Sequence, residues 1–238
     1  MGTDIKIIGL ITARGGSKSV PRKNLAELGG KPVIAWTIET ALQSSSVDSV
    51  IVSTDDDEIA EVSREWGAEV PFMRPAELSL DDTPHMAVML HAIHWLERHR
   101  DLRPDYIMLL QPTSPLRTSA DIDAAVRVAR ENSAVSVVSV CETHHHPYLI
   151  KRLAEDGTLF DFIEGAPQPG SMSIRRQAME PAYVVNGSIY LNARTMLLEE
   201  RTFLSQATLP YFMPNERSLQ IDEPWDLHLA ELILRDRS

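Results

Sequence analysis

Short apolar runs alternate with amphipathic segments from residue 5 to residue 141, and this alternation constrains the fold more than any other feature of the sequence. The run at 5–12 (IKIIGLIT) is almost continuously apolar and rich in β-branched residues, as expected of a strand buried on both faces of a parallel sheet. Such a strand needs helices above and below it, and segments with apolar residues at helical spacing follow. We therefore predict an α/β fold, a doubly wound, mostly parallel sheet with helices on both faces.

The same patterns predict the elements along the chain. We expect strands at residues 5–12, 48–54, 68–72, 105–111, 134–140 and 183–192, and helices at 32–43, 56–67, 84–99, 119–131 and 222–237. Ser119 is the expected N-cap of its helix, and Gly67 is expected to end another. The alternation breaks down from about 142 to 183, where short strands are expected at 148–154 and 158–163. We therefore predict one domain over residues 1–238 with an inserted lobe at about 142–183, a candidate for dimerisation.

The charge and the cysteine content argue against several classes of partner. The 238 residues include 34 Asp and Glu against 23 Lys and Arg, and the net charge of −11 repels nucleic acid over most of the surface. Cys141 is the only cysteine, so an internal disulfide and a cysteine zinc cluster are excluded, and a reducing cytoplasm is the expected location. No apolar run approaches the roughly 20 residues that cross a bilayer, so we expect no membrane association. A small anion in a local basic pocket is compatible with the net charge.

A basic segment with two glycines (ITARGGSKSVPRKN, residues 11–24) leaves the first predicted strand. Glycines allow the backbone to approach a phosphate closely, exposed N–H groups donate to it, and cations neutralise it. Gly15 and Gly16 would provide the approach, with Arg14 and Lys23 as the inward charges. The segment contains neither of the common nucleotide-binding fingerprints, G-x-G-x-x-G and G-x-x-x-x-G-K-[ST]. Its composition alone therefore supports a phosphate cradle and a solvated turn about equally.

Five further segments accompany this loop along the chain: VIVSTDDDEIAEVSREWGAEV, RPAELSLDDT, LLQPTSPLRTSADIDAAV, RRQ and NGSIYL. In this order and spacing they resemble the acylneuraminate cytidylyltransferase family, the CMP-sialic acid synthetases and their relatives. The resemblance implies a Rossmann-like nucleotidyltransferase fold and a homodimer. It also implies an enzyme that joins CMP to the anomeric hydroxyl of a sialic-acid-like 3-deoxy-2-keto sugar acid, using CTP and Mg²⁺ and releasing pyrophosphate.

The resemblance also implies roles for individual residues. The implied catalytic residues are Arg14, Lys23, Gln111 and Asp222. The implied nucleotide-binding residues are Leu10, Ala13, Arg14, Gly15, Gly16, Ser17, Lys23, Asn24 and Arg74, with Lys18 and Arg22 as weaker candidates. The implied substrate-binding residues are Gln111, Thr113, Ser114, Arg176, Gln177 and Asn186. Mg²⁺ would be held by Asp222, with Asp226 as a second candidate ligand.

Two positions depart from the family pattern. Val184 stands where sialate-activating members usually have an arginine, which removes one cation near the anionic ligands. Gln220 stands where many members have the first of two aspartates before the last helix, so metal binding would depend on Asp222. Two alternatives therefore stay open beside the main hypothesis. One is a nucleotidyltransferase that acts on a sugar phosphate or a non-sialate sugar with CTP or another NTP. The other is a nucleotide-binding regulatory module without turnover.

Several other polar residues have a structural explanation as well as a functional one. The aspartates at 55–57 are interpreted as charges at a helix N-terminus in preference to metal ligands. Arg117 precedes a helix cap and is interpreted mainly as structural, with contact to the ligand as the alternative. The adjacent histidines at 144–146 are expected to pack or to be solvated, because successive residues rarely point their rings at one centre.

Overall fold

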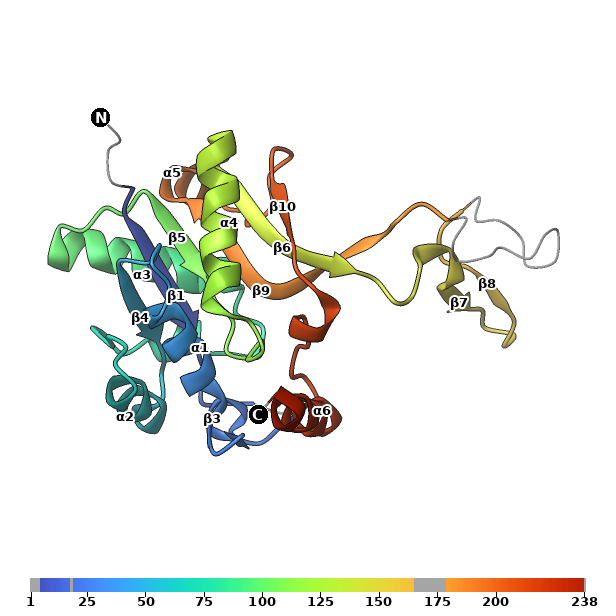
Figure 1. Cartoon of the computed structure of the whole chain (residues 1–238), viewed down its shortest axis with the longest axis horizontal. Helices are drawn as coiled ribbons and strands as arrows, with labels where there is room; N and C mark the ends of the chain where they lie inside the picture. Colours follow the sequence, from blue (N-terminus) through green and yellow to red (C-terminus); the bar gives the residue numbers. More distant parts are fainter. Residues whose placement is uncertain (1–4, 18, 165–178, 238) are drawn as a thin grey trace.

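The computed structural model describes residues 5–17, 19–164 and 179–237, and these residues form a six-stranded sheet with the strand order β10-β6-β9-β5-β1-β4 (Figure 1). The strands are β1 (Ile7–Thr12), β4 (Ser49–Ser53), β5 (Tyr106–Leu109), β6 (Ser136–Glu142), β9 (Tyr183–Ala193) and β10 (Leu209–Phe212). β9 runs antiparallel to β5 and β6, and the other neighbouring strands are parallel. The predicted α/β fold with a mostly parallel sheet is confirmed.

Helices cover both faces of the sheet. On one face, α1 (Val33–Leu42), α2 (Asp57–Glu65) and α4 (Ser119–Asn132) form a core cluster with Ile7 and Ile11 of β1. On the other face, α3 (His85–Arg100) and α5 (Arg194–Glu199) form a second cluster with Ile8 and Leu10. Because successive strand residues point to opposite faces, the continuous apolar run in β1 supplies both cores.

Smaller elements complete the body of the molecule. The C-terminal helix α6 (Pro224–Arg237) contributes Ala230 to a small core cluster with Leu28 of the β2–β3 hairpin and with Val33 and Ile221. The hairpin consists of β2 (Glu27–Leu28) and β3 (Lys31–Pro32). Short 3-10 helices lie at Lys23–Leu25, Ala76–Leu78, Pro147–Leu149 and Asn215–Arg217. The segment just before α6, residues 220–222, lies near the end of β5, where the N–H of Ile221 donates to the carbonyl of Thr113.

The structure corrects the prediction in several places. The strand expected at 68–72 is wrong, because Glu69 and Met73 make only isolated bridges, and Pro71 between them lacks the N–H that a strand would use. Strand β10 and helix α5 were not predicted. The N-cap of α4 is Thr118 instead of Ser119. The hydroxyl of Thr118 accepts from the backbone N–H of Asp121, whose carboxylate accepts from the N–H of Thr118 in return.

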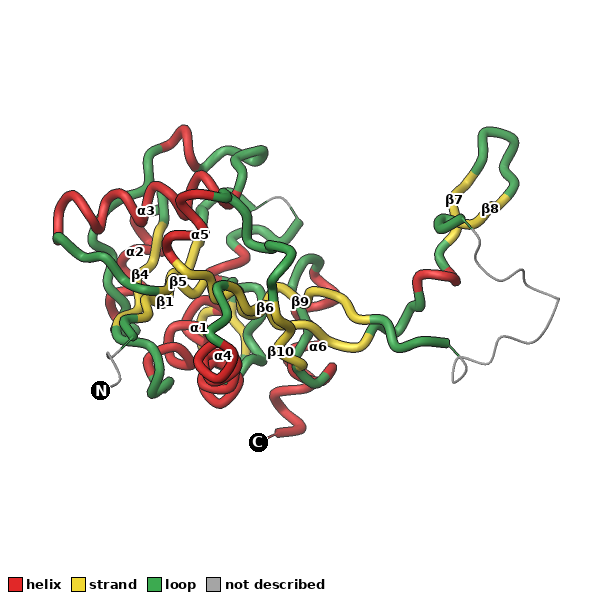
Figure 2. The backbone as a smooth tube through the Cα atoms, turned by 90° about the horizontal axis from the view of Figure 1, so that it is seen from above, coloured by secondary structure: helices red, strands yellow, loops and turns green. Residues whose placement is uncertain are grey.

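A two-stranded hairpin, β7 (Lys151–Leu153) and β8 (Leu159–Asp161), lies between β6 and β9 in the sequence and extends away from the body in both views (Figures 1 and 2). The two short strands predicted in the insertion are therefore confirmed. We call the described residues of this excursion, 143–164 and 179–182, the arm. Its apolar side chains are open to solvent, and Leu153 and Leu159 are 72% and 70% exposed.

The buried carboxylate of Asp121 joins α4 to β10 and to the segment that follows β10. It accepts hydrogen bonds from Tyr211 Oη at 2.7 Å and from Arg217 Nη2 at 2.8 Å, in addition to its part in the helix cap. Burial opposes ionisation of Asp121, but the hydrogen bonds from Arg217, Thr118 and Tyr211 outweigh it, so the pKa of Asp121 lies below its usual value.

We expect Asp121→Asn to lower the free energy of unfolding by about 2 to 3 kcal/mol at neutral pH, because the donor groups of three residues, Thr118, Tyr211 and Arg217, lose a charged acceptor. Since the folded-state pKa is depressed, this stabilisation is present above the unfolded-state pKa of about 4 and is lost as the pH falls through the folded-state pKa. Denaturant unfolding at neutral pH and at about pH 3 would measure the effect, with a smaller difference between wild type and variant in acid. A difference that is the same at both pH values would contradict it.

Candidate active site

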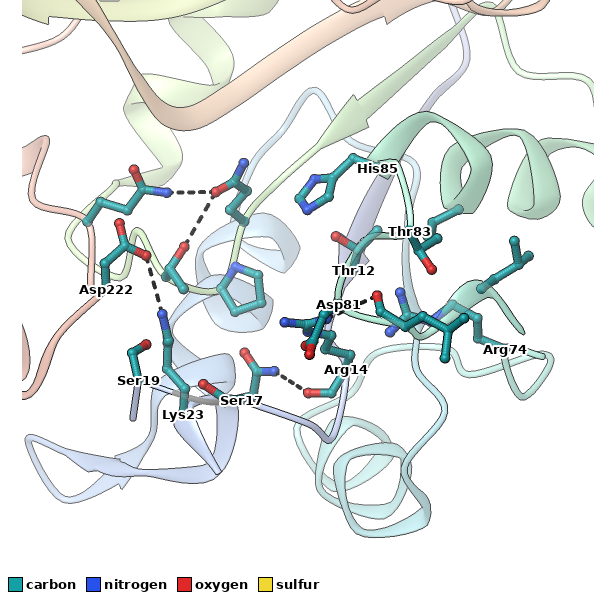
Figure 3. Close-up of a pocket in the computed structure, with 18 residues that line it drawn as sticks. Thr12, Arg14, Ser17, Ser19, Lys23, Arg74, Asp81, Thr83, His85 and Asp222 are labelled. Carbon is teal, nitrogen blue, oxygen red and sulfur yellow. Dashed lines mark hydrogen bonds and ion pairs between the residues drawn. The ribbon is translucent and has the colours of Figure 1, made fainter. Parts of the chain in front are cut away.

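A cleft of about 570 Å³ lies at the carboxyl ends of β1 and β5 (Figure 3). Thr12 is the last residue of β1, and Gln111 and Thr113 follow β5. The other walls come from the basic loop after β1, from residues 74–88 and from residues 220–222. This is the edge at which a doubly wound sheet binds ligands, because loops from several strands meet there.

Two cations of the basic loop, Arg14 and Lys23, line the cleft, and each has an acidic partner there. Arg14 Nη1 lies 2.9 Å from Asp81 Oδ1 and donates to the carbonyl of Leu80 at 3.1 Å. Lys23 Nζ lies 3.3 Å from Asp222 Oδ1 and donates to the carbonyl of Ile221 at 2.9 Å. These contacts hold both charges in place without a ligand, and they join the loop to residues far along the chain.

Asn24 and Gly15 determine how the loop is folded. The side-chain amide of Asn24, which is 9% exposed, donates to the carbonyl of Arg14 at 3.0 Å. The N–H of Gly15 donates to Asp55 Oδ1 at 3.2 Å, and a Cβ on Gly15 would lie 2.5 Å from Asp56 Oδ2. Glycine is therefore required at position 15 by the approach of the next loop, beside any contact with a phosphate.

Arg74 reaches the cleft from the segment after α2. Its Nη2 lies 3.3 Å from Asp55 Oδ1, the same oxygen that accepts from Gly15. Burial lowers the pKa of Arg74, and the charge and hydrogen bond of Asp55 act against that effect. Asp56 caps α2 by accepting from the N–H of Ile59 at 2.9 Å. These contacts agree with the interpretation of Asp55 and Asp56 as structural residues at the start of a helix.

Gln111, Thr113 and Gln220 form the opposite side of the cleft. Gln220 Nε2 donates to Gln111 Oε1 at 2.9 Å, and Thr113 Oγ1 donates to the same oxygen at 3.4 Å. The backbone N–H of Ile221 donates to the carbonyl of Thr113 at 2.7 Å. Residues 220–222 therefore contact both Lys23 of the basic loop and the segment that follows β5.

The structure brings eight of the sequence-predicted residues together in the lining of this one cleft: Arg14, Ser17, Lys23, Asn24, Arg74, Gln111, Thr113 and Asp222. The side chains of Leu10, Ala13 and Ser114 are buried, so a contact of Leu10 or Ala13 with a nucleotide would use the backbone. Gly15 and Gly16 lie in the basic loop outside the lining set. Three predicted residues, Lys18, Arg176 and Gln177, lie outside the described residues.

Three other predicted residues have partners in the protein interior or at a helix end. Asn186 is 5% exposed, and its side chain bonds Ser139 and Ser218 away from the cleft lining. Arg117 is 3% exposed and donates to the carbonyl of Ser188 at 2.6 Å and to Thr37 Oγ1 at 2.8 Å, which agrees with its structural interpretation. The Asp226 carboxylate accepts from the N–H groups of Asp222 and Glu223, so it acts as a cap at the start of α6.

His85 is a cleft residue that the sequence reasoning did not assign. It is the first residue of α3 and lines the cleft with Thr12 and Thr83, as labelled in Figure 3. Burial lowers the pKa of His85, and the positive charges of Arg74 and Arg14 lower it further, so its ring is neutral at pH 7. The available signal was its place at the start of a predicted helix, one residue after RPAELSLDDT. The remaining unassigned lining residues are Ser19, Leu78, Leu80, Asp81, Val88 and Pro112.

The described part of the chain contains no group of three or more His, Cys, Asp or Glu residues placed to hold a metal by themselves. Two of the adjacent histidines have partners in the protein. His144 Nε2 lies 3.2 Å from the Asn215 amide, and His146 Nε2 lies 3.1 Å from the carbonyl of Glu180.

In the same described ranges, none of the helices combines the length and the apolar character needed to cross a membrane.

Comparisons with known proteins show which family the chain resembles. The profile of the cytidylyltransferase family matches residues 8–222. The chain is 34% identical over 231 residues to the CMP-N,N'-diacetyllegionaminic acid synthase of Legionella pneumophila, with 97% of each chain covered. It is 35% identical over 220 residues to the N-acylneuraminate cytidylyltransferase of Streptococcus agalactiae, covering 92% of this chain and 51% of that relative, so it spans about half of the relative's length. A CMP-2-keto-3-deoxy-manno-octonic acid synthetase solved with CTP has a TM-score of 0.71 at 18% identity over 98% of this chain and all of the other, which shows the fold alone.

Proposed function

The chain belongs to the cytidylyltransferase family, and from this premise we propose that it activates a sialic-acid-like 3-deoxy-2-keto sugar acid by transferring CMP from CTP, with release of pyrophosphate. The observation that carries the proposal is that several sequence-predicted residues line the same cleft at the carboxyl ends of β1 and β5. Two cations from the loop after β1, Arg14 and Lys23, line it together with the polar side chains of Gln111 and Thr113.

In this reaction the anomeric hydroxyl of the sugar acid attacks the α-phosphorus of CTP and releases its proton to the solvent, and the bond from that phosphorus to the pyrophosphate oxygen breaks. The protein needs no covalent nucleophile, so its contribution is positioning and charge neutralisation. Arg14 and Lys23 neutralise the triphosphate and the departing pyrophosphate. Because Asp81 and Asp222 already hold these cations at the cleft, little rearrangement of the side chains is required when CTP binds.

Mg²⁺ is the proposed cofactor, with Asp222 as its protein ligand. The donor set fits, because the Asp222 carboxylate is 66% exposed at the cleft, and Mg²⁺ commonly uses one or two carboxylates together with water and substrate phosphates. When bound, the ion would supply positive charge at the phosphates. Asp226 is less suited as a ligand, since its carboxylate already accepts two backbone hydrogen bonds.

The proposed assembly is a cytoplasmic homodimer that pairs through the arm. The support is the set of apolar side chains that the arm exposes in the single chain: Tyr148, Leu149, Ile150, Leu153, Leu159, Phe160, Phe162 and Ile163. Exposed apolar surface of this extent commonly marks a protein–protein interface. The single, buried cysteine supports a reducing compartment.

Pyrophosphate release tests the reaction directly. The purified chain would be assayed with Mg²⁺, with each of CTP, UTP, ATP and GTP, and with N-acetylneuraminic acid, N,N'-diacetyllegionaminic acid, 2-keto-3-deoxy-manno-octonic acid and glucose 1-phosphate. We expect release only with CTP and with one or more of the first two acids. Release with glucose 1-phosphate, or with another nucleotide only, would replace the proposal with a different nucleotidyltransferase. Binding of CTP without turnover of any pair would favour the regulatory module.

A further inference from the structure

Gln220 is held against the segment that carries Gln111 by contacts on both sides. Its Nε2 donates to Gln111 Oε1 at 2.9 Å, and the next residue, Ile221, donates its N–H to the carbonyl of Thr113 at 2.7 Å. The carbonyl of Ile221 accepts from Lys23 Nζ at 2.9 Å. Gly187, at φ +73°, leaves room for this amide, since a Cβ there would lie 2.9 Å from Gln220 Nε2. The Gln220 side chain therefore has a defined place beside Gln111.

The hydrogen bonds of Gln111 determine which end of its carboxamide remains for a ligand. A carboxamide oxygen has two lone pairs, and Gln111 Oε1 accepts from both Gln220 Nε2 and Thr113 Oγ1. Within the described residues, the hydrogen bonds to the side chain of Gln111 go to its Oε1, and none is made by its Nε2. Since Gln111 lines the cleft, its two N–H donors are the groups that it offers there.

We infer that Gln220 is a positioning residue that keeps the N–H end of the Gln111 carboxamide available to the sugar acid. The inference rests on the proposed function and adds a specificity rule to it. Donors at this point recognise an oxygen that accepts hydrogen bonds, such as an oxygen of the acceptor's carboxylate or of an acyl carbonyl. An aspartate at position 220 accepts only, so it would draw the Gln111 N–H groups toward itself and turn Oε1 to the ligand. Glutamine at this position therefore changes what Gln111 can recognise.

Gln220→Met tests the inference, because methionine keeps the length of the side chain and removes both polar groups. We expect KM for the best acceptor of the panel to rise about 3- to 10-fold, the effect of one lost hydrogen bond, while KM for CTP and the Mg²⁺ concentration for half-maximal rate stay unchanged. In a Gln111→Met background the same change should have no further effect on the acceptor KM, since Gln220 acts through Gln111. Gln43→Met, at an exposed glutamine after α1 and outside the cleft, is the matched control.

Two kinetic results would overturn the inference. One is a changed CTP or Mg²⁺ dependence with an unchanged acceptor KM, which would make Gln220 a residue of the nucleotide or metal site. The other is an undiminished effect of Gln220→Met in the Gln111→Met background. Neither result would touch the proposed function, which depends on the nucleotide and the acceptor that the wild type turns over in the pyrophosphate assay.

A measurement without turnover decides the same point. The side-chain NH₂ signals of Gln111 in a ¹H–¹⁵N spectrum can be assigned from their loss in Gln111→Met. We expect these signals to shift in Gln220→Met and to stay in place in Gln43→Met, because only the first variant removes the donor to Gln111 Oε1. Unshifted Gln111 signals in a folded Gln220→Met variant would overturn the inference even if the wild type were inactive.

Discussion

Replacing Lys23 by methionine is expected to lower kcat/KM for CTP by about 10³-fold, because the protein loses a cation that its own contacts hold at the proposed triphosphate site. The Lys23 side chain is 12% exposed, and its ammonium is held by the carbonyl of Ile221 and the carboxylate of Asp222. Methionine retains the apolar stem and removes the charge. Steady-state pyrophosphate release would measure the loss, and circular dichroism would show that the variant is folded.

Lys6→Met provides the control, since Lys6 is an exposed lysine at the opposite end of β1 from the cleft. It should keep the wild-type kcat/KM. Lys23→Arg should recover only part of the rate, because the planar guanidinium presents its donors at different positions from an ammonium. A Lys23→Met enzyme whose kcat/KM for CTP lies within about 3-fold of the wild type would contradict a role of Lys23 at the triphosphate. A ratio of this size corresponds to less than about 1 kcal/mol of transition-state stabilisation.

The main architecture could be predicted because it depends on local patterns. The buried strand β1 and the amphipathic helices around it have periodicities that are visible in the sequence. The direction of β9 was not predictable in this way, since a run of apolar residues pairs in either orientation, and the structure places it antiparallel to β5 and β6. β10 is four residues long and contains Pro210, so its local signal was weak, and it is ordered by pairing with β6 at the edge of the sheet.

The candidate site, like the fold, has features that a local sequence pattern can show and contacts between distant residues that it cannot show. The basic loop was visible as a cluster of glycines and cations, and the structure places Arg14 and Lys23 at the cleft. The contact of Gln220 with Gln111 joins residues 109 positions apart, so no local pattern could indicate it. Position 220 was identified only as a departure from a family pattern. The structure shows that the glutamine at this position donates a hydrogen bond to Gln111, which a comparison of sequences does not show.

Asp222→Ala is expected to reduce turnover by about 10³-fold, because it removes the proposed Mg²⁺ ligand and the acidic partner of Lys23 together. The carboxylate is 66% exposed, so the fold should be retained. Binding of Mn²⁺ in the presence of CTP, followed by electron paramagnetic resonance, separates the two roles without turnover. Weaker Mn²⁺ binding in Asp222→Ala supports the ligand role. Unchanged Mn²⁺ binding with reduced turnover would leave Asp222 as a residue that orients Lys23.

Asp226 gives the matched comparison for this experiment, because it is a carboxylate one helical turn away with a different set of contacts. Its hydrogen bonds to the N–H groups of Asp222 and Glu223 stabilise the start of α6, so Asp226→Ala should lower the free energy of unfolding by about 1 kcal/mol. Mn²⁺ affinity should stay near that of the wild type if Asp222 alone supplies the protein ligand. A loss of Mn²⁺ affinity in Asp226→Ala as large as in Asp222→Ala would instead assign the ion to both carboxylates, and the Asp226 side chain would then have to leave its cap when the metal binds.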